Sequence, residues 1–290
     1  MTWKRVATAA ALIPFIVGVV LFGSTTVVAI VTAAVTILAL WEYFALGDAI
    51  GHRAYRLWTV LSAVLLVFQQ LPASFNLLFS IPGKTTFSTG SHELAEFPSI
   101  GLSFFIFMLG VTCLTLWTKR PLVEALPAAG ISSSALILVV FPLSYAIRLH
   151  GFPHQGPRLL LFALVITWAA DTTAYFVGRG VGKHPLAPHI SPKKTWEGSI
   201  GSMFGSLLVA YAFSYWIHIP LIHLLIMAVL GNIAGQMGDL LESAYKRSAG
   251  VKDSGGLLPG HGGILDRIDA LILCIPVIWY YLVLVNPSIR

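Results

Sequence analysis

Residues 264–285 read ILDRIDALILCIPVIWYYLVLV, in which three charged residues near the start are followed by an uninterrupted apolar stretch. A hydrocarbon core about 30 Å thick needs roughly 20 apolar residues in a helix, so this run is long enough to cross a bilayer. We therefore predict an all-α, polytopic membrane bundle of about nine transmembrane helices. The runs that predict them are 6–22, 24–46, 57–72, 99–118, 130–148, 159–178, 199–218, 221–240 and 264–285.

The composition excludes a water-soluble fold. The chain has 290 residues, of which 57% are hydrophobic and 10% charged, and its mean hydropathy is +0.83. Soluble domains carry about 25% charged residues, and disordered chains or disulfide-rich secreted scaffolds need more charge or more cysteine. The two cysteines, Cys113 and Cys274, lie in apolar runs and are expected to be small buried hydrophobic residues.

The distribution of lysine and arginine predicts the orientation. Lys4 and Arg5 precede the first apolar run, which we interpret as a retained signal-anchor with the N-terminus in the cytoplasm. Nine spans then leave four of the eighteen bases outside, namely Lys84, Arg148, Arg158 and Arg290. Because basic loops stay in the cytoplasm, we expect an inner (cytoplasmic) membrane protein whose polar loops 179–198 and 241–263 face the cytoplasm.

The acidic residues divide the chain into two regions. Residues 1–150 are expected to form a lipid-facing scaffold of transmembrane helices, in which Glu42 is interpreted as an interfacial residue. Residues 151–290 are expected to be the catalytic region. Seven of the twelve acids follow residue 170: Asp171, Glu197, Asp239, Glu242, Asp253, Asp266 and Asp269.

Two of these acids predict a metal site. Asp239 closes the run 221–240 and Asp266 opens the run 264–285, so both should reach the same membrane boundary. Carboxylates converging from two helices suit Mg²⁺, which is usually held by one or two carboxylates together with substrate phosphates. The alternative is charge pairing, Asp266 with Arg267 and Asp239 with Lys246.

The segment between these acids predicts a phosphate site. Gly262 and Gly263 stand just before a predicted helix N-terminus, where free amides attract phosphate. His261 is a candidate phosphate donor or general acid, and a structural role is the alternative. The neighbouring bases are candidate phosphate ligands or, alternatively, contacts for anionic lipid headgroups. They are Lys246, Arg247 and Lys252.

A second polar segment lies earlier in the chain. Asp171 falls inside a predicted span and should face the interior of the bundle. The later sequence Ser191-Pro-Lys193-Lys194-Thr suits a polyphosphate or a phospholipid headgroup, although a topology-determining basic loop is the alternative. The segment lacks the spacing of a P-loop, so no Walker-type nucleotide site is expected.

Taken together, these residues resemble a known family. Residues 243–269, from Ser243-Ala-Tyr-Lys246-Arg247 to Asp266-Arg267-Ile-Asp269, resemble the signature of the CDP-diacylglycerol synthases, or phosphatidate cytidylyltransferases. One departure is Tyr245, where the family more often has an aliphatic residue or Phe. The segments 171–175, 191–198 and 238–240 are also similar, so the resemblance covers roughly residues 165–275.

The resemblance implies that CTP and phosphatidate are converted to CDP-diacylglycerol and pyrophosphate at the cytoplasmic face. It implies Mg²⁺ bound by Asp239 and Asp266, a monovalent cation such as K⁺ nearby, and a homodimer; no nucleic-acid partner is expected. We assign catalysis to Asp239, Asp266, Lys252 and His261. We assign substrate binding to Asp171, Ser191, Lys193, Lys194, Ser243, Lys246, Arg247, Gly262, Gly263 and Arg267.

Two other functions fit some of these features. A transporter of phosphorylated anions would use intramembrane acids, but it predicts an inverted repeat and acids near the bilayer midplane. No repeat is evident in the sequence. A CTP-dependent kinase of a polyprenol or similar lipid alcohol would instead transfer the γ-phosphate of CTP and release CDP.

Overall fold

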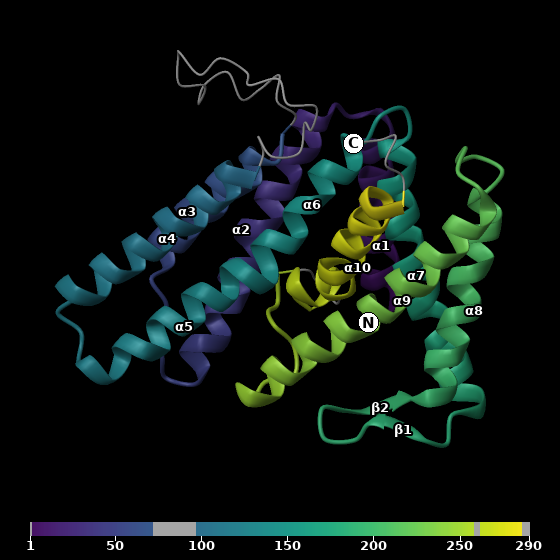
Figure 1. The fold of residues 1–290 in the computed structure, drawn as a ribbon. Helices are drawn as coiled ribbons and strands as arrows, with labels where there is room; N and C mark the ends of the chain where they lie inside the picture. Colours follow the sequence, from purple (N-terminus) through teal and green to yellow (C-terminus); the bar gives the residue numbers. More distant parts are fainter. Residues whose placement is uncertain (1, 72–96, 258–261, 286–290) are drawn as a thin grey trace, which may run out of the picture.

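The computed structural model describes residues 2–71, 97–257 and 262–285, which form a helical bundle (Figure 1). A short antiparallel hairpin of β1 (Pro185–Ala187) and β2 (Ser191–Thr195) lies at one end of it. The α-helices are α1 (Thr2–Phe22), α2 (Thr25–Ala49), α3 (Arg56–Gln69), α4 (Phe97–Trp117), α5 (Ala125–Ala135), α6 (Phe141–His150), α7 (Gly156–Val181), α8 (Trp196–Phe213), α9 (Leu221–Ser248) and α10 (Leu265–Val285).

Helices α5 and α6 form one rod. The π-helical segment Leu136–Val140 joins them without a break, so the predicted run 130–148 corresponds to a single element whose hydrogen-bond pattern changes in the middle. Pro142, the second residue of α6, has no N–H to donate. A local π-helical turn is one way in which a helix accommodates such a missing donor.

The predicted all-α membrane bundle is confirmed. Within the described residues, six elements are long and apolar enough to cross a bilayer: α2, residues 100–117 of α4, the rod Leu122–His150, α7, α9 and α10. The segments Ala10–Phe22 and Arg56–Gln69 are apolar but shorter. Helix α8 has 18 residues but includes Glu197 and several glycines and serines. The number of nine spans therefore stays a prediction.

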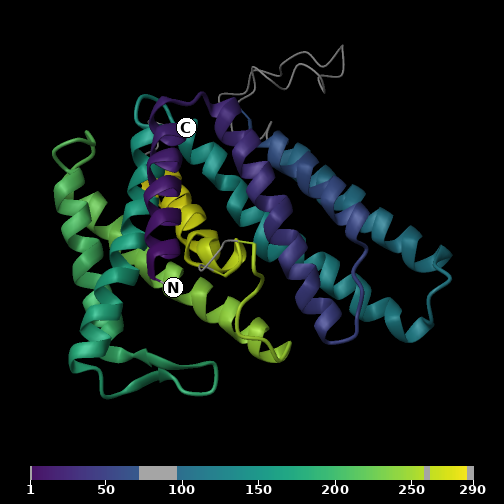
Figure 2. The same ribbon diagram turned by 180° about the vertical axis from the view of Figure 1, so that it is seen from behind.

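The connections alternate between the two ends of the bundle (Figures 1 and 2). The α2–α3 and α4–α5 connections lie at the same end as the β-hairpin and the C-terminal end of α9. The α1–α2, α6–α7 and α8–α9 turns lie at the opposite end. The α2–α3 and α4–α5 connections, the hairpin and the C-terminal end of α9, all basic and all predicted to face the cytoplasm, therefore lie at one end of the fold.

Glycines bring α9 and α10 into close contact. A Cβ atom on Gly238 would lie 2.3 Å from the carbonyl oxygen of Asp269, and one on Gly231 would lie 3.1 Å from the Sγ of Cys274. Cys274 is fully buried there, as predicted, whereas Cys113 on α4, also predicted to be buried, is only partly buried. Such glycine contacts let the backbones of membrane helices approach closely. Asp239 is the next residue after Gly238, so it lies on α9 beside this close crossing.

Helices α7 and α8 pack in the same manner. The Cβ positions of Gly201 and Gly205 are filled by Val177 and Thr173 of α7. Thr195 caps α8 by accepting a hydrogen bond from the amide of Gly198, 3.1 Å from its Oγ1. The hairpin that precedes α8 is thereby held against the end of α7.

Helix α10 is the central element of the bundle. It packs against α9 and α7 of the C-terminal half and against α2 and α6 of the N-terminal half. The helix that begins with Asp266 is therefore positioned from both halves of the chain.

Candidate active site

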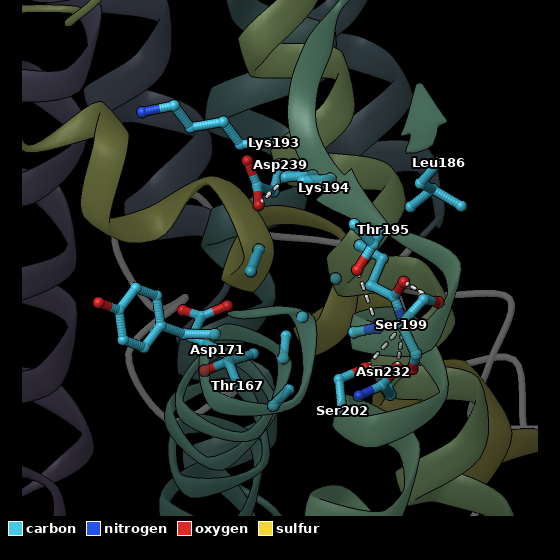
Figure 3. Close-up of a pocket in the computed structure, with 18 of the residues that line it drawn as sticks. Thr167, Asp171, Leu186, Lys193, Lys194, Thr195, Ser199, Ser202, Asn232 and Asp239 are labelled. Carbon is cyan, nitrogen blue, oxygen red and sulfur yellow. Dashed lines mark hydrogen bonds and ion pairs between the residues drawn. The ribbon is translucent and has the colours of Figure 1, made fainter. Parts of the chain in front are cut away.

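A cavity of about 410 Å³ lies between α7, α8, α9 and the strand β2 (Figure 3). Its charged lining residues are Asp171, Arg179, Lys193, Lys194 and Asp239. Much of the remaining wall is made of small residues, which include Gly178, Gly198 and Gly235. Three residues predicted to bind substrate and one predicted to bind metal therefore share one cavity.

An ion pair joins the hairpin to α9 inside this cavity. The Nζ of Lys194 lies 2.5 Å from Oδ2 of Asp239, and the two side chains are 27% and 29% exposed. The Oγ of Ser243 lies 3.5 Å from the other carboxylate oxygen. Figure 3 shows the Asp171 carboxylate on the wall below this pair. The pairing of Asp239 with Lys246 considered as an alternative is wrong, because Lys194 takes that place.

The opposite wall of the cavity contains an amide and hydroxyl network. Gln236 accepts a hydrogen bond from Ser199, at 2.5 Å, and donates one to Ser202, at 3.0 Å. Asn232 donates to Ser206 at 2.7 Å. These residues were not predicted from the sequence. The sequence pattern that could have identified them is the helical spacing of polar side chains within the apolar runs 199–218 and 221–240.

Glu197 anchors the hairpin at the cavity mouth. Its carboxylate lies 2.6 Å from Nδ1 of His184 and 3.3 Å from the backbone nitrogen of the same residue. Its own amide and the His184 side chain stabilise the charged form and lower the pKa of Glu197 to about 2. The carboxylate is therefore ionised at neutral pH and holds the start of the hairpin.

A second charged cluster joins α9 to the start of α10. The Nζ of Lys246 lies 2.5 Å from Oε2 of Glu242 and 2.5 Å from Oδ1 of Asp266. These side chains are at most 12% exposed. The helix α9 continues to Ser248, so Lys246 and Ser243 lie on a helix and not in the loop predicted over 241–263. The prediction ended the helix early because the apolar run stops near residue 240.

The backbone amides before α10 are occupied by carboxylates of this chain. Oδ2 of Asp266 accepts hydrogen bonds from the amides of Gly263, at 2.8 Å, and Ser254, at 3.1 Å. The amides of Ile264 and Leu265 donate to Glu42, at 2.9 and 2.8 Å. The free amide predicted at Gly263 is therefore wrong for this conformation. Gly262 retains the left-handed conformation, with φ of 78°.

The interfacial position predicted for Glu42 is also wrong. Glu42 lies on α2, is only 4% exposed, and contacts the segment before α10. The prediction failed because Glu42 is distant in sequence from the residues that it contacts, and its neighbour Trp41, which is 65% exposed, suggested a membrane surface.

The two clusters are neighbours and share an excess of acids. Asp269 is within electrostatic range of Asp171, Asp239 and Glu242. Asp171 is also within range of Lys194 and Arg267. Over residues 2–71, 97–257 and 262–285, no three acidic, histidine or cysteine side chains form a ready-made metal site. This donor set is compatible with Mg²⁺ bound by one or two of the carboxylates, with substrate phosphates as its other ligands.

The other predicted site residues lie around these clusters. Arg247 is exposed and donates to the carbonyl oxygen of Ile190 in the hairpin, at 3.3 Å. Ser191 opens β2, and Lys252 is exposed in the loop after α9. His261 lies outside the described residues.

Comparison with known proteins identifies related sequences. The sequence model of the cytidylyltransferase family matches residues 3–285. The chain is 35% identical over 221 residues to a phosphatidate cytidylyltransferase of Staphylococcus haemolyticus, and the match covers 76% of each protein.

Two further relatives match over a shorter stretch. A phosphatidate cytidylyltransferase of Haemophilus influenzae is 41% identical over 174 residues, which are 57% of this chain and 59% of that protein. A phosphatidate cytidylyltransferase of Bacillus subtilis is 41% identical over 157 residues, 53% of this chain and 58% of that protein. The chain thus matches just under three fifths of the length of these two relatives.

Proposed function

Because this chain belongs to the cytidylyltransferase family, we propose that it transfers the cytidylyl group of CTP to phosphatidate. The products are CDP-diacylglycerol, which stays in the membrane, and pyrophosphate. The observation that carries the proposal is the cavity in which Lys193, Lys194, Asp171 and Asp239 converge within a bundle of membrane helices. An anionic lipid headgroup and a triphosphate both bind well to cationic side chains such as these lysines.

The proposed reaction needs no covalent enzyme intermediate. A phosphate oxygen of phosphatidate attacks the α-phosphorus of CTP, forming a new phosphorus–oxygen bond while the bond to the pyrophosphate breaks. Such transfers ask a protein chiefly for positioning and for neutralisation of charge. Lys193, Lys194 and Ser191 on the hairpin are proposed to bind one substrate phosphate group. Lys246, Arg247, Lys252 and Arg267 are proposed to bind the other, and His261 to donate to a phosphate oxygen.

We propose that Asp239 and Asp266 hold Mg²⁺. The ion supplies charge neutralisation for the triphosphate and the leaving pyrophosphate. Asp239 is well suited, because its carboxylate faces the cavity and three further acids lie in or next to the two clusters. Asp266 would be the second acidic residue to hold the ion; in this structure its Oδ1 contacts Lys246, and its Oδ2 accepts from the amides of Ser254 and Gly263.

The wider setting is likewise a proposal. The common position of the basic connections and the hairpin supports an inner-membrane protein with its cavity open to the cytoplasm. A homodimer and a K⁺ ion near the carboxylates rest on the family resemblance alone. No nucleic-acid partner is proposed.

The product assay tests the reaction. Purified full-length protein receives phosphatidate, Mg²⁺ and CTP labelled either on the α- or on the γ-phosphate. We expect the α-label in the lipid fraction and the γ-label in pyrophosphate, with both products lost when Mg²⁺ is chelated. The γ-label in a lipid together with free CDP would instead identify a lipid kinase. Uptake of a phosphorylated solute into vesicles without either product would identify a transporter.

A pair of variants tests the site. Asp239→Asn should lower kcat by roughly 100-fold or more, because removing a preorganised electrostatic contact commonly costs that much. Glu124→Gln is the matched control. Glu124 does not line the cavity, and its Oε2 lies 3.3 Å from Nδ1 of His52. Equal rates for the two variants would contradict the assignment of Asp239.

A further inference from the structure

Glu42 has an unusual environment for an acidic residue on a membrane helix. Its described hydrogen-bond partners are an Oγ–H and two backbone N–H groups: Ser254 Oγ at 3.0 Å, the Ile264 amide at 2.9 Å and the Leu265 amide at 2.8 Å. Both carboxylate oxygens are used, because Ile264 donates to Oε1 while the other two groups contact Oε2. The side chain is 4% exposed, so these bonds replace almost all of its hydration.

Glu42 caps the catalytic helix from another part of the chain. The first amides of an α-helix have no partner within the helix, and a negative charge at that end interacts favourably with the helix dipole. The amides of Ile264 and Leu265 are such groups at the start of α10. Asp266, the proposed metal ligand, is the next residue. The position of its carboxylate therefore depends on a residue 224 positions earlier, in the half of the chain predicted to be a scaffold.

Two glycines lie so close to the Glu42 carboxylate that a side chain at either position would overlap it. A Cβ atom on Gly255 would lie 2.6 Å from Oε1 of Glu42, and one on Gly263 would lie 2.3 Å from Oε2. For Gly255, the three nearest atoms within 4 Å all belong to Glu42. Gly256, by contrast, has nothing within 4 Å of its Cβ position. The segments on both sides of residues 258–261 therefore close onto the same carboxylate.

Ser254 couples Glu42 to Asp266 directly. Its Oγ lies 3.0 Å from Oε2 of Glu42 and 3.0 Å from Oδ2 of Asp266. A hydroxyl has one proton to donate, so Ser254 is shared between the two carboxylates and fixes their separation. Asp266 in turn holds Lys246 through Oδ1. A displacement of Glu42 would thus be transmitted to one proposed metal ligand and one proposed substrate-binding base.

We propose that Glu42 is a positioning residue of the active site, which sets the placement of Asp266 and Lys246 by capping α10 and clamping Ser254, Gly255 and Gly263. The inference rests on the proposed function for the roles of Asp266 and Lys246. The capping itself does not depend on which reaction these residues carry out. The N-terminal half therefore contributes a residue to the assembly of the site.

The first test keeps Glu42 and changes only the space around it. Gly255→Ala places a methyl group against the carboxylate, whereas Gly256→Ala adds the same group in open space. We expect Gly255→Ala to lower kcat roughly 10- to 100-fold, the cost that small misplacements of catalytic groups commonly carry. Gly256→Ala should stay within about two-fold of the wild type. Equal kcat values for the two alanine variants would overturn the proposal.

The second test removes the acceptor. Glu42→Gln keeps the size but turns one acceptor into a donor that faces backbone N–H groups. The control is Ser132→Ala, because Ser132 is fully buried and accepts from the amide of Tyr55 before α3, at 2.8 Å. Both variants should lower the melting temperature. Glu42→Gln alone should also lower kcat roughly ten-fold or more, while the KM for CTP changes less than about three-fold.

Hydrogen exchange separates failure of this inference from failure of the proposed function. In Glu42→Gln, or in Gly255→Ala if the first variant does not fold, the amides of Ile264 and Leu265 should exchange faster than in the wild type and in Ser132→Ala. Unchanged exchange together with wild-type kcat would overturn the positioning role. Faster exchange in a protein whose wild type makes no CDP-lipid would overturn the proposed function and leave the cap standing.

Discussion

The contact between Lys194 and Asp239 is a poor source of stability. Each side chain is more than a quarter exposed, but the Nζ of Lys194 is itself buried, so the cost of removing its charge from water offsets much of the attraction to Asp239. An ion pair on a cavity wall, next to Asp171 and Lys193, is better explained by binding of a charged ligand. Lys194 belongs to the hairpin and Asp239 to α9. A ligand that separates this pair and binds to both side chains would therefore contact both elements.

This arrangement predicts the effect of removing the base. Lys194→Met should raise the KM for one of the two anionic substrates roughly 10- to 100-fold, because a charged contact to phosphate is worth about 1.5–3 kcal/mol. The same variant should need less Mg²⁺ for half-maximal rate, since Asp239 loses its competing cation. Initial rates against each substrate and against Mg²⁺ measure both effects. Lys183→Met, an exposed base outside the cavity, is the control, and unchanged KM values in Lys194→Met would contradict this role.

Lys246 belongs to a different class of ion pair. It is 12% exposed and lies between Glu242 and Asp266, which are 5% and 9% exposed. Removing one partner of a buried pair leaves uncompensated charge and costs about 3–5 kcal/mol. Lys246→Met should therefore lower the melting temperature in detergent strongly. Adding Glu242→Gln should restore part of the loss, because one of the two unpaired carboxylates is then gone. A double variant no more stable than Lys246→Met would show that the charges do not interact in this way.

At the scale of helices, glycines determine how close the acids come to one another. Gly238 faces the backbone of Asp269, so even one methyl group there meets an atom that cannot rotate away. Gly130 lies in α5 with nothing within 4 Å of its Cβ position. The same substitution at these two positions therefore separates the effect of helix packing from that of helix propensity.

Gly238→Ala should destabilise the protein by about 1–3 kcal/mol, the usual cost of overpacking. Its activity should fall as well, since Asp239 and Asp269 move apart. Gly130→Ala should be neutral or slightly stabilising, because alanine is the better helix former. Thermal unfolding and initial rates of both variants provide the comparison. A Gly238→Ala protein as stable and as active as Gly130→Ala would disprove close packing at this crossing.

The helices could be predicted from sequence, but the contacts between them could not. Each predicted apolar run lies mostly on helix in the described residues, although 199–218 extends past the end of α8 at Phe213, because a run of about 20 apolar residues has few other stable states in a bilayer. The hairpin was not predicted, since Ser191-Pro-Lys193-Lys194 has neither alternation nor a recognisable turn signal. The environment of Glu42 depends on the packing of α2 against α10. The spacing of apolar residues along a single sequence does not indicate which distant helices pack together.

At the scale of the whole molecule, the site is assembled from both halves. The cavity is built by α7, α8, α9 and the hairpin, whereas the helix that carries Asp266 is also packed by α2 and α6. The division into a scaffold over residues 1–150 and a catalytic region over 151–290 stays a prediction, although Glu42 of the first region contacts the start of α10. If Glu42 has the proposed positioning role, we expect a variant in the N-terminal half to change catalysis without touching a substrate.

The orientation of this assembly can be tested by labelling single cysteines with a membrane-impermeant maleimide. The background is Cys113→Ala with Cys274→Ala, and the positions are Lys119→Cys, Lys183→Cys and His218→Cys, all exposed in the structure. If α8 crosses the bilayer, Lys183→Cys and His218→Cys must react from opposite sides, because they lie on either side of this helix. We expect Lys119→Cys and Lys183→Cys to react in inverted vesicles and His218→Cys to react in right-side-out vesicles.

Helix α8 is the decisive element for this experiment. At 18 residues it is about 27 Å long, slightly less than the roughly 30 Å of a bilayer core, and Glu197 lies in its first turn. Its close packing against α7 through Gly201 and Gly205 favours a full crossing, since α7 is itself long enough to span. Labelling of Lys183→Cys and His218→Cys from the same side would remove α8 from the count of spans. The hairpin and its lysines would still belong to the cavity, but the loop after α8 would no longer face the outside.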